Sequence, residues 1–128
     1  MLADSKAFSG IGVDDFDEAK RFYGETLGLR TTVDDEENGL MTLHLAGDRD
    51  TLLYRSHTFA PAGYTVLNFE VDDIDAAVDE LTSRGVQFEQ YNSDEIPQDE
   101  KGVMRAGGPF IAWFKDPAGN VLSVLQNR

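Results

Sequence analysis

Residues 71–81 read VDDIDAAVDEL, a stretch that joins an alternating strand to an amphipathic helix through a tight acidic junction. A near copy, VDDFDEA, occupies residues 13–19. The valines that open the two stretches, Val13 and Val71, are 58 residues apart. A repeat held in such close register predicts two copies of one structural unit.

Each copy predicts the element order β-α-β-β-β. Aspartates at the helix starts, Asp15 and Asp73, predict N-caps, and Gly28 and Gly85 predict the helix ends. Alternating apolar residues predict the strands 8–13, 29–33, 40–45 and 51–55 in the first copy, and 65–71, 86–91, 110–114 and 121–125 in the second. Residues 57–63 form the predicted connector, and residues 92–108 a long polar loop, which we interpret either as a lid or as a surface loop.

This organisation predicts an α+β fold. Two pseudo-symmetric βαβββ modules, at about residues 7–57 and 64–126, are expected to form a single domain over residues 1–128. A helix covers one face of each curved mixed sheet, and the other faces are expected to enclose a cavity.

The charge of the chain limits its partners. Acidic residues outnumber basic ones 24 to 11, for a net charge of −13. This excludes nucleic acid and anionic membranes as expected partners, because binding to phosphates needs basic patches. Two interpretations of the charge stay open, namely a solvated acidic surface, with or without adaptation to salt, and a field that attracts a cationic ligand.

Composition also bears on location. The chain has no cysteine, no apolar run of membrane-spanning length and no signal-peptide pattern. We therefore expect a cytoplasmic protein.

The paired acidic junctions and the stretch FKDPAGN at residues 114–120 carry a family resemblance. Together they resemble the vicinal oxygen chelate superfamily, which includes glyoxalase I, bleomycin-resistance proteins and extradiol dioxygenases. The resemblance covers nearly the whole chain. It implies the two-module cavity fold and a homodimer, and it leaves the activity open because function depends on the site.

The resemblance also implies where a metal would bind. In metal-dependent members, His, Gln and Glu ligands lie on the cavity-facing strands, at positions that match Phe8, Val66 and Ser123, with a fourth near Leu53 or Tyr54. None of these side chains is a good ligand for a divalent first-row metal. We therefore expect no metal and no cofactor.

Strand parity predicts which polar residues line the cavity. Since Leu67 and Phe69 should pack under the helix, Asn68 and Glu70 should face the other way. Asn68 can orient a ligand by hydrogen bonds, and Ser123 can donate one in place of the lost metal ligand. Glu70 is either a desolvated general base or a solvated carboxylate at the rim.

Further candidates each have two interpretations. Five aromatic residues of the predicted strands either line the cavity as an aromatic wall or fill the core, namely Tyr54, Tyr91, Phe110, Trp113 and Phe114. Phe8, on the cavity-facing side of the first predicted strand, is a further ligand-binding candidate. His44, with His57 and a carboxylate, either forms an atypical metal site or is an ordinary hydrogen-bonded histidine. A last candidate, Arg105, binds an anionic ligand or pairs with Asp99 or Glu100.

The sequence thus favours a protein that binds a small, partly aromatic molecule in the cavity between its modules, without the usual divalent metal. The alternative is a lyase, isomerase or dioxygenase of the same superfamily that uses an atypical site. A third class, a structural or interaction module, would have a cavity filled with side chains.

Overall fold

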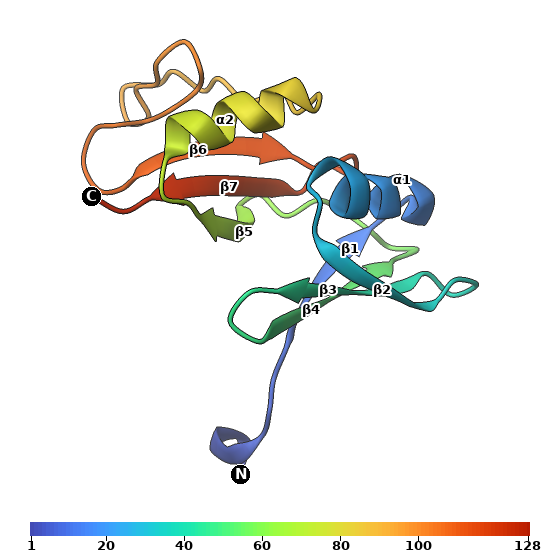
Figure 1. Cartoon of the computed structure of the whole chain (residues 1–128). Coiled ribbons are helices and arrows are strands. Elements are labelled where there is room, and N and C mark those ends of the chain that lie inside the picture. The colour runs from blue at the N-terminus through green and yellow to red at the C-terminus, as the bar shows by residue number, and fades with distance from the viewer. The chain divides into compact units, whose positions relative to one another are not determined.

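The computed structural model describes all 128 residues and divides the chain into two compact units, Met1–Ala60 and Pro61–Arg128. The boundary falls inside the segment 57–63, which was expected to connect the two copies. Both units combine a helix with a mixed sheet, so the predicted α+β class is confirmed (Figure 1). None of the helices has the length and apolar character of a membrane span.

The first unit has a four-stranded sheet in the order β1-β4-β3-β2. Its first and last strands, β1 and β4, pair in parallel, and the other neighbours are antiparallel. The elements of this unit are η1 (Leu2–Asp4), β1 (Ser9–Val13), α1 (Phe16–Lys20), η2 (Arg21–Thr26), β2 (Arg30–Asp35), β3 (Leu40–Leu45) and β4 (Arg49–Arg55).

The second unit has a three-stranded sheet in the order β5-β7-β6. Again the first strand pairs in parallel with the last, and the remaining pair is antiparallel. Figure 1 shows the helix of this unit lying across one face of the sheet. The elements are β5 (Thr65–Glu70), α2 (Ile74–Ser83), β6 (Phe110–Lys115) and β7 (Val121–Gln126).

Both acidic junctions cap their helices as predicted. The Asp15 carboxylate accepts a hydrogen bond from the Glu18 amide at 3.0 Å, and the Asp73 carboxylate accepts one from the Ala76 amide at 3.1 Å. These bonds satisfy backbone donors that the first helical turn leaves without a partner. The repeated aspartates therefore serve the fold.

The first helix departs from the prediction of one regular helix ending at Gly28. After α1 the chain continues as the π-helical turn η2, in which the Leu27 amide donates to the Phe22 carbonyl five residues earlier. Tyr23, within this wider turn, is fully buried. A π-helical turn adds a residue to the turn, which a pattern of apolar spacing does not reveal.

The predicted strand at residues 86–91 was wrong. Only an isolated bridge forms there, between Phe88 and Phe114. The side chain of Gln98 takes the place of a strand partner: its Oε1 accepts from the Tyr91 and Asn92 amides, and its Nε2 donates to the Glu89 carbonyl. These backbone groups are therefore satisfied by one side chain and not by a ladder.

Candidate functional site

Each sheet has one face made of alternating buried apolar residues and one that is more polar. In the second unit the buried face carries Leu122 and Val124 of β7 and Ala112 and Phe114 of β6, all less than 4% exposed. This is the face that α2 covers. We call the opposite side of the sheet, which carries Asn68, Ser123 and Trp113, the open face of the second unit.

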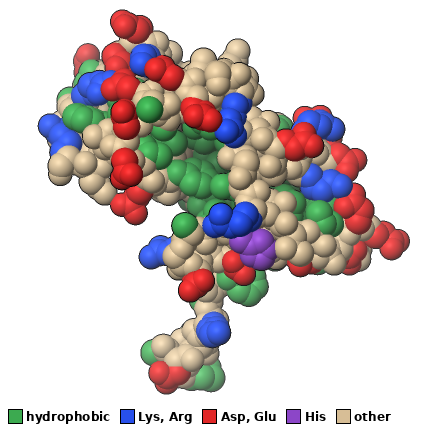
Figure 2. All heavy atoms as spheres, in the orientation of Figure 1, with side chains coloured by type: hydrophobic (Ala, Val, Ile, Leu, Met, Phe, Trp, Pro, Cys, Tyr) green, Lys and Arg blue, Asp and Glu red, His purple; other side chains and the backbone are tan.

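The open face places three predicted site residues in one row. Asn68 of β5 and Trp113 of β6 are both in register with Ser123 of the central strand β7. Residues in register on neighbouring strands point to the same side of a sheet, so the three side chains are neighbours. Figure 2 shows hydrophobic side chains gathered over β5 and β7 in the second unit.

Ser123 and Asn68 form a direct contact within this row. The Ser123 hydroxyl donates a hydrogen bond to the Asn68 Oδ1 at 2.6 Å. Ser123 is fully buried, whereas Asn68 is exposed. The buried Ser123 hydroxyl thus holds the side-chain amide of Asn68, which is exposed to solvent.

Trp113 is held by an aromatic neighbour. The rings of Trp113 and Tyr91 meet edge to face, with centroids 5.7 Å apart and planes at 69°. Burial raises the pKa of the Tyr91 hydroxyl, and the negative charge of Glu89 raises it further. The tyrosine ring supports the indole through this edge-to-face contact.

Glu70 also lies on the β5 strand, two residues after Asn68. The Glu70 side chain is exposed, and its Oε1 accepts a hydrogen bond from the side-chain Nδ2 of Asn127 at 2.9 Å. Two residues apart on one strand, Asn68 and Glu70 point to the same side. The carboxylate here is solvated.

In the first unit, Tyr54 covers the glycines of β1. A Cβ atom added to Gly10 would lie 3.3 Å from the Tyr54 ring, and one added to Gly12 would lie 3.8 Å from it. The ring therefore occupies the space that the missing side chains leave. Phe8 lies one residue before β1 and is 71% exposed.

His44 lies on the same side of the first sheet as Tyr54, by the register of β3 and β4. Its Nδ1 is 3.2 Å from the Asp50 carboxylate, and its Nε2 is 2.7 Å from the Thr32 hydroxyl. A neutral ring in this setting carries its proton on Nδ1 and accepts from Thr32. The sequence missed both partners, which only the pairing of β3 with β2 and β4 brings to the histidine.

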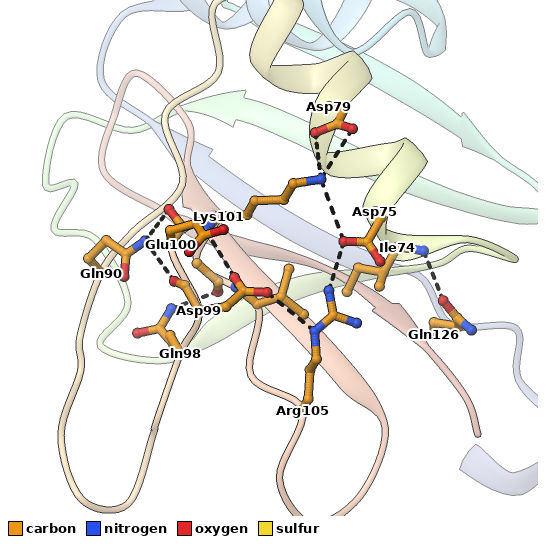
Figure 3. Close-up of polar contacts among 12 residues, drawn as sticks. Ile74, Asp75, Asp79, Gln90, Gln98, Asp99, Glu100, Lys101, Arg105 and Gln126 are labelled. Carbon is orange, nitrogen blue, oxygen red and sulfur yellow. Dashed lines mark hydrogen bonds and ion pairs between the residues drawn. The ribbon is translucent and has the colours of Figure 1, made fainter.

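Arg105 is not on the open face. Its guanidinium donates to Asp75 of α2 at 2.7 Å and to Asp99 at 3.2 Å (Figure 3). The guanidinium also lies over the Phe110 ring. Of the two loop acids expected as partners, the structure shows Asp99. The arginine therefore fastens the loop 92–108 to the helix.

The loop 92–108 also contacts α2 through Lys101, and hydrogen bonds connect residues within the loop. Lys101 contacts Asp79 at 3.0 Å and Asp75 at 3.6 Å, as Figure 3 shows. Val103 is buried, and its amide donates to the Asp99 carboxylate. The loop is thus anchored to α2 by charged and buried contacts.

These contacts make the loop sensitive to acid. Burial alone would raise the pKa of Asp99, but hydrogen bonds from the Val103 and Lys101 amides and from Arg105 outweigh it and lower the pKa. Because the carboxylate has a lower pKa in the folded state, its stabilisation is complete above about pH 4 and is lost as the pH falls through the lowered value. We expect Asp99→Asn to cost about 1–2 kcal/mol near pH 7.

Thermal unfolding of the two proteins between pH 3 and pH 7 measures this dependence. The difference between wild type and Asp99→Asn should shrink below pH 4. A difference that stays constant down to pH 3 would contradict the role given to Asp99.

A family model described as the Glyoxalase/Bleomycin resistance protein/Dioxygenase superfamily matches residues 7–124. The chain belongs to this superfamily. No curated protein sequence matches it.

Several solved structures are similar to this chain over nearly its whole length. The chain is similar to TnmS3, an antibiotic-binding protein from Streptomyces sp. CB03234, with 27% identity over 98% of each chain and a TM-score of 0.69. It is also similar to a glyoxalase/bleomycin resistance protein from the same Streptomyces, with 29% identity over 95% of this chain and 100% of that one and a TM-score of 0.65. A superfamily member from Sphaerobacter thermophilus shares 26% identity over 96% and 98% of the two chains, with a TM-score of 0.69.

The side chains at the metal-ligand positions that the family resemblance implies do not suit a divalent metal. Of the matched ligand positions, Phe8 and Val66 have no donor atom, and the Ser123 hydroxyl is engaged with Asn68. Neither unit contains a group of three or more His, Asp or Glu side chains that could hold a metal ion.

The strand pairing bears on the fourth position, which the sequence left near Leu53 or Tyr54. Gly10 and Asn68 are equivalent by the 58-residue offset, and they pair with Leu52 and Ser123 respectively. By this pairing the counterpart of Ser123 is Leu52, one residue before Leu53 and two before Tyr54. Leucine also has no donor atom.

The first unit has a hollow of about 330 Å³ on the other side of its sheet. It has acidic side chains, one arginine and one phenylalanine, and none of the predicted site residues lines it. Its lining residues are Asp14, Asp15, Phe16, Asp17, Glu36 and Arg55. The aspartates include the helix cap, so we assign this hollow to the acidic junction and not to the open face.

Proposed function

We propose that this superfamily member binds a small, partly aromatic molecule on the open face of its second unit, without a divalent metal. One observation carries the proposal: Trp113 lies in one row with the hydrogen-bonded pair of Ser123 and Asn68. An indole offers a flat apolar surface, and the amide beside it offers a polar contact that fixes orientation.

Two further observations support it. TnmS3, to which the chain is similar at 27% identity, is an antibiotic-binding protein, so binding of a small molecule is the role named for a protein of this fold. The net charge of −13 favours a neutral or cationic ligand over an anionic one. A protein that sequesters its ligand fits both.

Trp113→Ala should weaken binding of a flat neutral probe, 9-fluorenone, about tenfold, because the variant loses the aromatic wall. Equilibrium dialysis measures the dissociation constants of the wild type and the variant. Trp113→Phe, which keeps a ring, should lose less. Tyr64→Ala removes an aromatic residue that is 71% exposed and precedes β5, and it serves as the control with unchanged binding.

Unchanged binding by Trp113→Ala would contradict the proposal. The same samples test the enzymatic alternative, since mass spectrometry of the recovered probe shows whether it was converted. Elemental analysis of protein purified without affinity-tag metal tests the remaining part. Stoichiometric nickel, zinc or iron would contradict binding without a metal.

A further inference from the structure

The Ser123 hydroxyl has a single hydrogen-bond acceptor for its proton, the side chain of Asn68. The side chain is fully buried, and its hydroxyl forms a single hydrogen bond, the 2.6 Å contact with Asn68. A buried hydroxyl proton without an acceptor costs free energy, and no solvent reaches this one. The proton therefore points at Asn68, and the atom that receives it must be an acceptor.

This requirement fixes the orientation of the Asn68 amide. An asparagine has one acceptor, Oδ1, and one donor group, the Nδ2 amine, and a flip of the side chain exchanges them. In the flipped state Ser123 would face an amine, and its proton would lose its only acceptor. The amide is therefore held with Oδ1 inward and Nδ2 outward.

The outward amine has no hydrogen-bond partner within the protein, and the residue is exposed. Asn68 and Trp113 flank Ser123 on either side, so about two strand spacings, roughly 10 Å, separate their backbones. A flat molecule of two or three fused rings that packs on the indole can therefore reach the amine with a group at its edge.

We infer that the open face of the second unit selects aromatic ligands that carry a hydrogen-bond acceptor, such as a carbonyl oxygen, at the ring edge, and that Ser123 is the positioning residue for this selectivity. The inference rests on the proposed function. To the proposed function, this inference adds that the ligand carries an acceptor group and that Ser123 sets this requirement.

The test compares 9-fluorenone with fluorene, which has the same flat ring system and a methylene in place of the carbonyl. The readout is the ratio of their dissociation constants, measured by equilibrium dialysis, because a general loss of stability affects both probes equally. In the wild type the carbonyl should improve binding about fivefold.

Asn68→Asp keeps an acceptor for the Ser123 proton but replaces the outward amine with an oxygen. It should lower the preference for fluorenone about tenfold or more, because two acceptors then face each other. Ser123→Ala releases the amide to flip and should lower the preference about threefold. Asn38→Asp, the same chemical change in an exposed turn of the first unit, is the matched control and should leave the ratio unchanged.

The outcomes separate the two proposals. If both probes bind but the ratio is near one in the wild type, or is unchanged in Asn68→Asp, the selectivity is overturned and the proposed function stands. If neither probe binds, the proposed function is overturned and the selectivity with it. A ratio that falls in Asn68→Asp and Ser123→Ala, with the control unchanged, supports the inference.

Discussion

Phe114→Ala is expected to lower the free energy of unfolding by about 3–5 kcal/mol, as the truncation of a buried phenylalanine does when its surroundings cannot collapse. Phe114 is 1% exposed on the helix-covered face of the second sheet. Its ring meets the Phe88 ring edge to face at 5.5 Å, and its backbone forms the bridge to Phe88. The same residue therefore anchors a strand and the segment that follows the helix.

Urea denaturation followed by circular dichroism measures this loss. Phe110→Ala is the matched control, because Phe110 lies on the same strand but is only half-buried between two arginines. It should cost about 1–2 kcal/mol. Equal losses in the two variants would contradict the role of Phe114 as an anchor.

The second large effect is expected at Asp116. Its buried carboxylate accepts hydrogen bonds from the Ala118 and Asn120 amides and from the Asn120 side chain, at 2.8–3.0 Å. Asp116→Ala removes the carboxylate that accepts these three hydrogen bonds. We expect a loss of about 2–4 kcal/mol in the free energy of unfolding.

Two variants check this explanation by the same denaturation measurement. Asp116→Asn keeps one acceptor oxygen and should lose about half as much. Asp72→Ala removes an exposed aspartate that caps no helix, and it should change stability by less than about 0.5 kcal/mol. A small effect of Asp116→Ala would show that the turn does not depend on its carboxylate.

The parts of the fold that could be predicted are those specified by neighbouring residues. Asp15 and Asp73 cap helices through bonds to residues three positions away. The strand at 40–45 has the predicted bounds because its alternation is complete within six residues. The parity of β5 was likewise readable, and it placed Asn68 on the open face.

The features that the sequence did not predict depend on contacts between residues far apart in the chain. The strand expected at 86–91 is replaced by bonds to Gln98, a residue in what reads as an irregular loop. The pairing of Asn68 with Ser123 spans 55 positions, and no local pattern reveals it. The sequence therefore named the members of the row but not their hydrogen bond, which is what fixes the orientation of the amide.

The strand order of the second unit has a consequence for synthesis of the chain. Its central strand is β7, and β7 is the only strand that pairs with β5 and with β6. On its other edge β6 forms only the isolated bridges to Phe88 and Met104. On the ribosome the first unit is complete once β4 has emerged, whereas the second has no sheet at all until β7 follows. Until β7 has emerged, β5 has no strand partner and β6 has only isolated bridges, so the second unit then exposes strand edges that favour aggregation.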